Sequence, residues 1–319
     1  MRDRTFTPDP EQLALWPDAS GNQINGLNET GFRRPRHVYW HDPDQITFGQ
    51  VQKWFYQKNA DPSLDESRRE RARLTAIPLP EQAAKATSRS AAEWTALIRE
   101  KALAFGASDV GITRLDPNWF YEGYSAPFSH IIVLAIAMDY QNMKAAPEIS
   151  AGVEVVNKYT RGMQVSKDLA GFLLEQGHAA EPEFGPLAGP MTVIPAALAA
   201  GMGELGKHGS IIHRKFGSCF RLAAVLTSLP LECDSPDDFG AADFCAACQV
   251  CSNACPPDAI MPDRQIVRGV EKWYVNFDKC LPFFNETAGC GICVTVCPFS
   301  RPGVGDNLVA KLARRRGGA

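Results

Sequence analysis

The spacing of apolar residues predicts a layered core of helices and strands in the middle of the chain. Apolar residues recur at helical spacing from Ser90 to Phe105, and Ser90 and Glu93 form a capping box at the start of this helix. Apolar runs at 109–112, 131–138 and 220–229 predict buried strands, and longer helical stretches are expected at 154–176 and 191–200. Helices that alternate with strands favour an α/β or α+β arrangement.

The first 90 residues have weak periodicity and are rich in Pro, Asp, Arg and aromatic side chains. We expect an irregular segment that wraps the core, with a helix near 48–58 and an exposed helix or linker at 61–73. We therefore divide the chain into an N-terminal segment (1–89), a catalytic core (90–235) and a cysteine-rich domain (236–319).

Composition and charge argue against a nucleic-acid partner and against a membrane-spanning segment. The chain has 319 residues, 45% of them hydrophobic, and a net charge of −3, so no basic field attracts nucleic acid. The longest apolar run, 131–138, is too short to span a membrane. Because the N-terminus lacks the apolar region of a secretory signal, we expect a cytoplasmic protein with no membrane span.

Eight of the ten cysteines lie between Cys245 and Cys297. The first four follow the spacing C-x2-C-x2-C-x3-C-P, which is typical of bacterial proteins with two [4Fe–4S] clusters. Two-residue gaps bring three sulfurs to one cluster, and the three-residue gap turns the fourth toward the other. The remaining cysteines, Cys219 and Cys233, are interpreted as ordinary buried thiols.

The reciprocal half of this pattern follows downstream as Cys290-x2-Cys293-x3-Cys297-Pro298, with Cys280 displaced upstream. The expected ligand sets are Cys245, Cys248, Cys251 and Cys297 for one cluster, and Cys255, Cys280, Cys290 and Cys293 for the other. A pair of structural zinc sites is the alternative. It fits less well, because two Cys-Pro endings and a four-cysteine run are typical of [4Fe–4S] clusters.

One glycine-rich pattern matches the dinucleotide-binding motif, but its surroundings do not fit that motif. Gly201, Gly203 and Gly206 match G-x-G-x-x-G, but the preceding run is helical and no acid follows about 20 residues later. We therefore interpret the glycines as allowing close approach of the backbone to some other flat or bulky group.

Taken together, these motifs resemble the corrinoid-dependent reductive dehalogenases from about Ser90 to Pro302. The resemblance rests on the glycine turn, the run 220–232 and both cysteine motifs, including the displaced Cys280. The pieces 159–162, 206–208 and 216–218 are also similar to epoxyqueuosine reductase, a tRNA-modification enzyme. That family has a catalytic aspartate at the position of Gln164, which argues against the tRNA reaction here.

The resemblance implies an α+β fold, in which a nitroreductase-like, cobalamin-binding core precedes a ferredoxin-like module with two clusters. It implies a reductive dehalogenase that replaces carbon–halogen by carbon–hydrogen in a small organohalide. The cofactor would be a base-off cobalamin, and electrons would come from an external donor such as a ferredoxin or flavodoxin. The alternatives are an epoxyqueuosine-reductase-like enzyme and a non-enzymatic two-cluster electron carrier.

The resemblance also implies roles for individual residues. Tyr159 matches the family's proton donor, with Tyr140 in reserve, and Lys207 matches the cation that assists the tyrosine. The corrinoid would lie against the glycine turn and two neighbours, namely Gly201, Gly203, Gly206, His208 and Tyr140. The family's substrate-pocket asparagine would fall near 185–189, where this chain has none.

Overall fold

A four-stranded antiparallel sheet forms the centre of the protein. The computed structural model describes residues 6–185 and 189–317. The strands are β1 (Asp109–Arg114), β2 (His130–Ala137), β3 (Ala180–Phe184) and β6 (Phe220–Thr227), in the order β1-β2-β6-β3. Strand β2 pairs with β6 over its full length and with β1 over residues 130–135, so most of its backbone is hydrogen-bonded on both sides.

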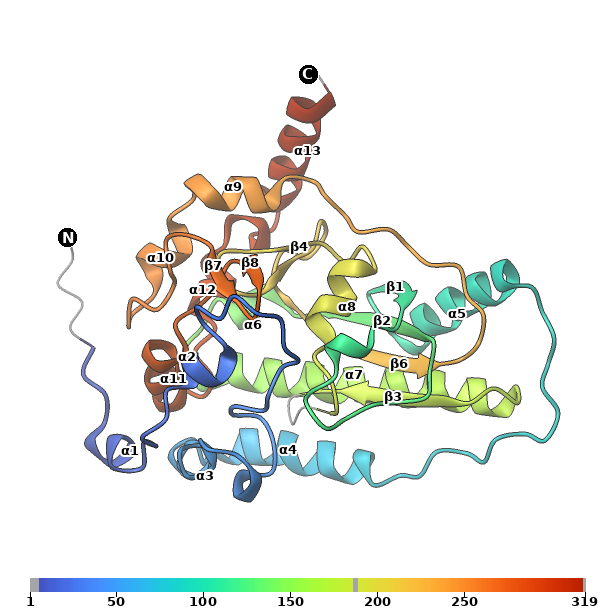
Figure 1. The fold of residues 1–319 in the computed structure, drawn as a ribbon, viewed down its shortest axis with the longest axis horizontal. Coiled ribbons are helices and arrows are strands. Elements are labelled where there is room, and N and C mark those ends of the chain that lie inside the picture. The colour runs from blue at the N-terminus through green and yellow to red at the C-terminus, as the bar shows by residue number, and fades with distance from the viewer. Residues whose placement is uncertain (1–5, 186–188, 318–319) are drawn as a thin grey trace.

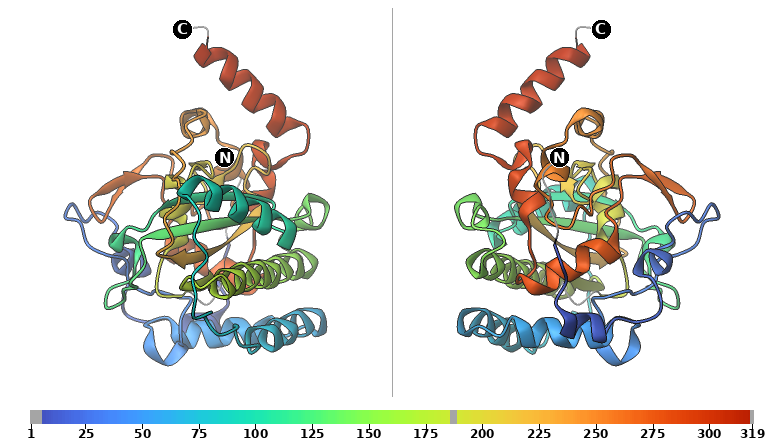
Figure 2. Two further views of the ribbon diagram at one scale, coloured as in Figure 1. Left: turned by 90° about the vertical axis from the view of Figure 1, so that its right-hand side faces the viewer. Right: turned by 90° about the vertical axis from the view of Figure 1, so that its left-hand side faces the viewer.

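Both faces of the sheet are covered. Alternate residues of β2 point to opposite faces, so Ile132 and Leu134 pack with α5 (Ala91–Phe105) and α7 (Ile149–Glu175), while Ile131 and Val133 pack with α8 (Val193–Ala199). Helix α4 (Pro62–Thr75) packs on the outer side of α7. Figure 2 shows α4 and α7 as successive layers on one side of the sheet.

The cysteine-rich part is built from short elements beside this sheet (Figure 1). The helices are α9 (Ala241–Ala247), α10 (Val250–Ala254), α11 (Phe277–Glu286), α12 (Ile292–Val296) and α13 (Val304–Gly317), with the hairpin β7 (Gln265–Val267) and β8 (Val270–Lys272). The remaining short elements of the chain are α1 (Pro10–Ala14), α2 (Gly21–Asn25), α3 (Gly49–Lys58), α6 (Tyr140–Met143), β4 (Glu204–Leu205), β5 (Ile211–Ile212) and three 3₁₀ turns. Among the described residues, no helix is long and apolar enough to cross a membrane.

The sequence located most of these elements. The expected α+β class is confirmed, and the capping box of Ser90 and Glu93 is present. Strand β3 was not expected. Its sequence, Ala-Glu-Pro-Glu-Phe, is too polar to suggest a buried strand, but it forms the edge of the sheet, where a proline is tolerated.

The N-terminal segment is tied to α11 by a buried polar network. Asn285, which is fully buried, accepts a hydrogen bond from the Tyr39 hydroxyl (2.7 Å) and donates one to Gln12 Oε1 (3.0 Å). Its backbone carbonyl accepts from Asn59 Nδ2 (2.7 Å). Three separate parts of the N-terminal segment therefore converge on one residue of the cysteine-rich part.

We predict that Asn285→Ala destabilises the protein by about 2–3 kcal/mol, because it leaves the Tyr39 hydroxyl and Gln12 Oε1 buried without their partner. Urea denaturation of the iron-loaded protein measures the change. The control is Asn307→Ala, an exposed position on α13 where a change within about 0.5 kcal/mol is expected. Equal stability of the two variants would mean that the network does not hold the segment.

Candidate active site

Four of the expected cluster ligands line one internal cavity. Cys245, Cys248, Cys251 and Cys297 surround this space together with Lys207, His208 and Phe299. The first three come from α9, α10 and the turn between them, whereas Cys297 follows α12. The structure thus places Cys297 beside the three cysteines of the first motif.

The other four cysteines form a second group. Burial raises the pKa of Cys280 to about 12, and the next largest contributions come from Cys290 and Cys255. Cys293 has Cys290, Cys280, Cys255 and Cys251 as its electrostatic neighbours. The backbone at Cys290 and Gly291 has positive φ (49° and 83°), which forms a tight turn between Cys290 and Cys293.

Burial dominates the chemistry of both groups. It raises the pKa of Cys245 to about 11 and that of Cys297 to about 12, because a low-dielectric interior disfavours the thiolate. The thiolates that ligate iron therefore require a positive metal centre beside them. Of the two remaining cysteines, Cys219 is buried as expected, but Cys233 is exposed because it lies in the extended linker after β6.

A large cavity of about 490 Å³ opens at one end of the central sheet. This volume is in the range of about 300–1,000 Å³ that is usual for cofactor and ligand sites. Its wall combines aromatic and aliphatic surface, including Tyr39, Trp40, Tyr121 and Met191, with polar groups at its edge. The Nε2 atom of His37, another wall residue, is buried without a partner in the described structure. The cavity can accept a flat apolar group that carries polar substituents.

Tyr159 lines this cavity between two arginines. The guanidinium carbon of Arg221 lies 5.4 Å from the centre of the tyrosine ring, and that of Arg71 lies 6.0 Å away. The side chains of Arg221 and Arg71 donate to the backbone carbonyls of Phe220 and Gly185, respectively. Their Nε atoms are buried without partners in the described structure. Two guanidinium groups are therefore available to an anion beside the tyrosine.

Glu183 is the buried acid of the cavity wall, and its side chain is 4% exposed. A Cβ at Gly189 would lie 2.1 Å from Glu183 Oε2, so the carboxyl group occupies space that only glycine leaves open. Burial, and to a smaller extent Glu181, raises the pKa of Glu183 to about 7. The resemblance implied a substrate-pocket asparagine near 185–189. Positions 185 and 189 are glycines, and 186–188 lie outside the described residues.

The resemblance implied that Lys207 lies next to Tyr159, but the structure places it beside the first cysteine group. It is fully buried and lines the cavity of the first cysteine group, where its Nζ lies 3.3 Å from the Ala246 carbonyl oxygen and 5.0 Å from the centre of the Trp273 ring. The cations against Tyr159 are Arg71 and Arg221 instead. The glycine turn directs Lys207 toward the cysteines, which its position in the sequence did not reveal.

The glycine turn itself does not line the large cavity. A Cβ at Gly203 would lie 2.1 Å from the Ile212 carbonyl oxygen, one at Gly201 would lie 2.6 Å from that of Ser235, and one at Gly206 would crowd His208. These glycines allow segments of the protein to pass close to one another. We had expected them to leave room for a corrinoid.

The two other residues expected at the corrinoid also lie elsewhere in the described structure. The Tyr140 hydroxyl donates to the Thr295 carbonyl (3.3 Å), and its ring packs beside Cys293. His208 accepts at Nδ1 from Ser210 N–H (3.2 Å), and its Nε2 lies 3.1 Å from Ser218 Oγ. Burial lowers the pKa of His208 to about 4, so it is neutral.

The contact between His208 and Ser218 joins the two cavities. His208 lines the cysteine cavity and Ser218 lines the large one. Because Nδ1 accepts, Nε2 carries the proton and donates to Ser218 Oγ, which in turn donates to the Ile211 carbonyl (2.9 Å). The first cysteine group is therefore one hydrogen-bonded pair away from the large cavity.

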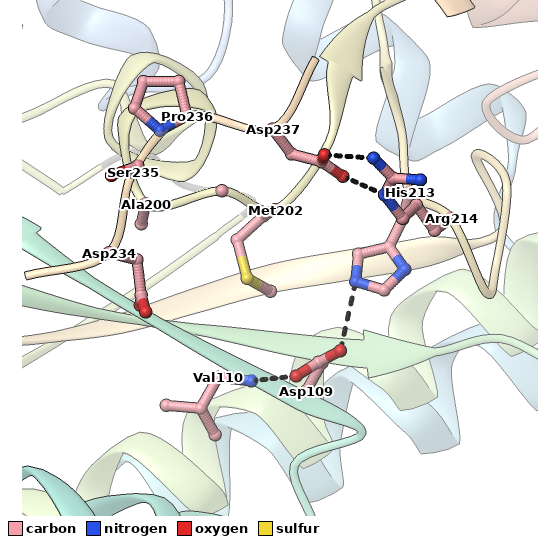
Figure 3. A pocket seen from close by; sticks show the side chains of 11 residues that line it. Asp109, Val110, Ala200, Met202, His213, Arg214, Asp234, Ser235, Pro236 and Asp237 are labelled. Atoms are coloured by element: carbon pink, nitrogen blue, oxygen red, sulfur yellow. Dashed lines mark hydrogen bonds and ion pairs between the residues drawn. The ribbon is translucent and has the colours of Figure 1, made fainter. Parts of the chain in front are cut away.

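A further polar pocket of about 320 Å³ lies at the other side of the glycine turn (Figure 3). His213 Nε2 approaches Asp109 Oδ2 (3.4 Å), and this contact, with Lys215, holds the pKa of Asp109 well below its usual range. Arg214 makes two bonds of 2.6 Å to Asp237. These pairs fasten the linker after β6 to the sheet, so we interpret this pocket as structural.

We predict that Cys280→Ala loses about four of eight iron atoms per chain, because one [4Fe–4S] cluster loses a ligand. Iron analysis of anaerobically prepared protein measures this loss. The matched control is Cys233→Ala at the exposed cysteine, which should keep all iron. Full iron retention in Cys280→Ala would mean that another residue ligates the second cluster.

Glu183 gives a prediction for pH dependence. Burial raises its pKa from the usual 4.5 of a glutamate to about 7 in the folded protein, so the folded state keeps a proton that the unfolded chain releases. The free energy of unfolding should fall by up to about 3 kcal/mol as pH rises from about 4.5 to about 7. Glu183→Gln should remove most of this loss, whereas Glu181→Gln at the exposed neighbour should retain most of it. Urea titrations at pH 5 and pH 8 measure the difference, and identical pH profiles for wild type and Glu183→Gln would contradict it.

Comparison with known proteins agrees with this architecture. Residues 244–300 match the 4Fe-4S dicluster domain family. The tetrachloroethene reductive dehalogenase of Desulfitobacterium hafniense is 31% identical over 230 residues, which cover 67% of this chain and 40% of the relative. The epoxyqueuosine reductase of Leadbetterella byssophila is 30% identical over 221 residues, which cover 59% of this chain and 64% of that protein.

A solved structure has the same fold. The catabolic reductive dehalogenase NpRdhA, in complex with 3-bromo-4-hydroxybenzoic acid, superposes with a TM-score of 0.75 at 22% identity, over 90% of this chain and 45% of that one. The present chain thus spans less than half the length of these dehalogenases. The chain belongs to the reductive dehalogenase family, with the epoxyqueuosine reductases as more distant relatives.

Proposed function

We propose that this protein is a reductive dehalogenase that uses cobalamin and two [4Fe–4S] clusters to replace the carbon–halogen bond of a small organohalide by carbon–hydrogen. The proposal rests on one observation: Tyr159 lines the large cavity, and the guanidinium groups of Arg71 and Arg221 lie against its ring. A phenol that can release a proton and two cations that can hold an anion meet the needs of this reaction.

The eight cysteines of the dicluster domain would hold the two clusters in the sets given by their spacing. The cavity of Cys245, Cys248, Cys251 and Cys297 supports the first set. The mutual proximity of Cys255, Cys280, Cys290 and Cys293 supports the second. Cys245, Cys251, Cys255 and Cys297 are buried, whereas the other four cysteines are partly exposed.

The large cavity would hold the cobalamin. Its aromatic and aliphatic wall suits the faces of a corrin ring, and the unpartnered Nε2 of His37 can bond an amide arm at its edge. When bound, cobalamin supplies a low-valent metal that is able to reduce a carbon–halogen bond. The protein supplies the walls, the proton and the charge stabilisation around it.

The overall reaction consumes two electrons and one proton and releases one halide ion. Tyr159 would give its hydroxyl proton to the carbon that loses the halogen. Arg221 and Arg71 would stabilise the resulting phenolate by Coulomb attraction and favour return of a proton from solvent. In this assignment Arg71 and Arg221 replace Lys207 as the cations that assist the tyrosine.

Electrons would enter from an external donor such as a ferredoxin or flavodoxin. The pair His208 and Ser218 links the first cysteine group to the large cavity by a hydrogen bond, and it would carry the last transfer. His208 is held neutral with a fixed tautomer, so this link does not depend on pH near neutrality.

We predict that Tyr159→Phe reduces halide release from an organohalide at least about 100-fold, which is the usual contribution of a positioned proton donor. Iron and cobalt contents should be unchanged, because the hydroxyl holds neither metal. Halide release with chemically reduced donor measures turnover, and elemental analysis measures metal content.

Tyr140→Phe is the matched control, because its hydroxyl bonds to the Thr295 carbonyl outside the cavity. This variant should keep most of the activity. Full activity of Tyr159→Phe, or equal loss in both variants, would overturn the assignment of the proton donor.

A further inference from the structure

Lys207 is a buried cation that lacks a protein counter-charge. Its side chain is fully buried, and its ammonium group has a carbonyl oxygen at 3.3 Å and the Trp273 ring at 5.0 Å. Among the described residues no carboxylate lies within ion-pair distance of its Nζ. A buried ammonium without a negative partner is strongly disfavoured, and protein chains avoid one unless a ligand supplies the charge.

The position of Lys207 indicates which ligand that is. Lys207 lines the cavity of Cys245, Cys248, Cys251 and Cys297. Both its backbone N–H and its charge lower the pKa of Cys245, against the larger effect of burial. Four thiolates make a bound [4Fe–4S] cluster an anion in both oxidation states, and reduction adds one more negative charge. The buried cation and the anionic cluster would compensate each other.

Trp273 supports the same interpretation. It belongs to one buried cluster of side chains with Cys245 and Cys297, and its Nε1–H is buried without a partner in the described structure. One face of its ring contacts the Lys207 ammonium group, and Arg264 lies 5.3 Å from the ring centre. The Lys207 cation and an unused donor thus lie beside this cysteine group.

We propose that Lys207 is the fixed counter-charge of the cluster held by Cys245, Cys248, Cys251 and Cys297, and that it raises the midpoint potential of this cluster relative to its neighbour. The cation stabilises the reduced, more negative form more than the oxidised form. The cluster that contacts the large cavity through His208 would therefore be reduced in preference to the other cluster. This proposal rests on the cysteine assignment and is independent of which substrate is reduced.

The test is redox titration of the iron-loaded holoprotein with dithionite, followed by electron paramagnetic resonance, in wild type, Lys207→Met and Lys207→Arg. Lys207→Met keeps the apolar stem and removes the charge. We expect at least a tenfold shift of one cluster's reduction equilibrium toward the oxidised form, about 59 mV for one electron, with the other cluster shifted less. Lys207→Arg should stay near wild type, as should Lys215→Met, a control at an exposed lysine.

Two other results are informative. Loss of about four iron atoms from Lys207→Met, with full iron in Lys207→Arg, would also support the proposal, because the charge would then be needed to hold the cluster. Full iron with unchanged potentials in Lys207→Met, or equal disturbance by Met and Arg, would overturn it. Halide release is not used as a readout, so failure of the proposed reaction and failure of this inference are distinguishable.

Discussion

The structure depends on holding eight cysteine sulfurs as thiolates in an interior that favours the neutral thiol. Burial raises the pKa of Cys245, Cys280 and Cys297 to between about 11 and about 12, so iron and local donors must compensate. The protein supplies such donors locally: the Ala259 N–H bonds to the Cys255 sulfur, and Lys207 brings both an N–H and a cation to Cys245. Placement of the short helices α9–α12 follows from this need, since each sulfur must face the interior while its backbone stays hydrogen-bonded.

The same constraint explains why the N-terminal segment and the central sheet are fastened to the cysteine-rich part. In the proposed reaction, a cluster passes electrons to a cofactor in the large cavity, so the two would have to lie at fixed places relative to each other. The network around Asn285 fixes α11 to the segment that covers the cavity, and the His208–Ser218 pair fixes the first cysteine group against the cavity wall.

Local patterns were sufficient to locate the cysteine groups, the capping box and the strands β1, β2 and β6. The environment of Tyr159 was not predictable, because Arg71 and Arg221 come from α4 and β6 and meet the ring only in the folded protein. The surroundings of Lys207 were not predictable for a related reason: its place in the glycine turn says that the chain bends there, not which way the side chain points. Glu183 was missed because the edge strand β3 has no apolar pattern that would mark it as buried.

The central claim is that one chain joins two iron–sulfur clusters to a cobalamin in the large cavity. Iron and cobalt per chain, measured on anaerobically prepared protein supplied with a corrinoid, test it most directly. The account predicts about eight iron atoms and about one cobalt atom per chain. Eight iron atoms without cobalt would contradict the cobalamin assignment and leave an electron carrier, and zinc in place of iron would contradict the assignment of both cysteine groups.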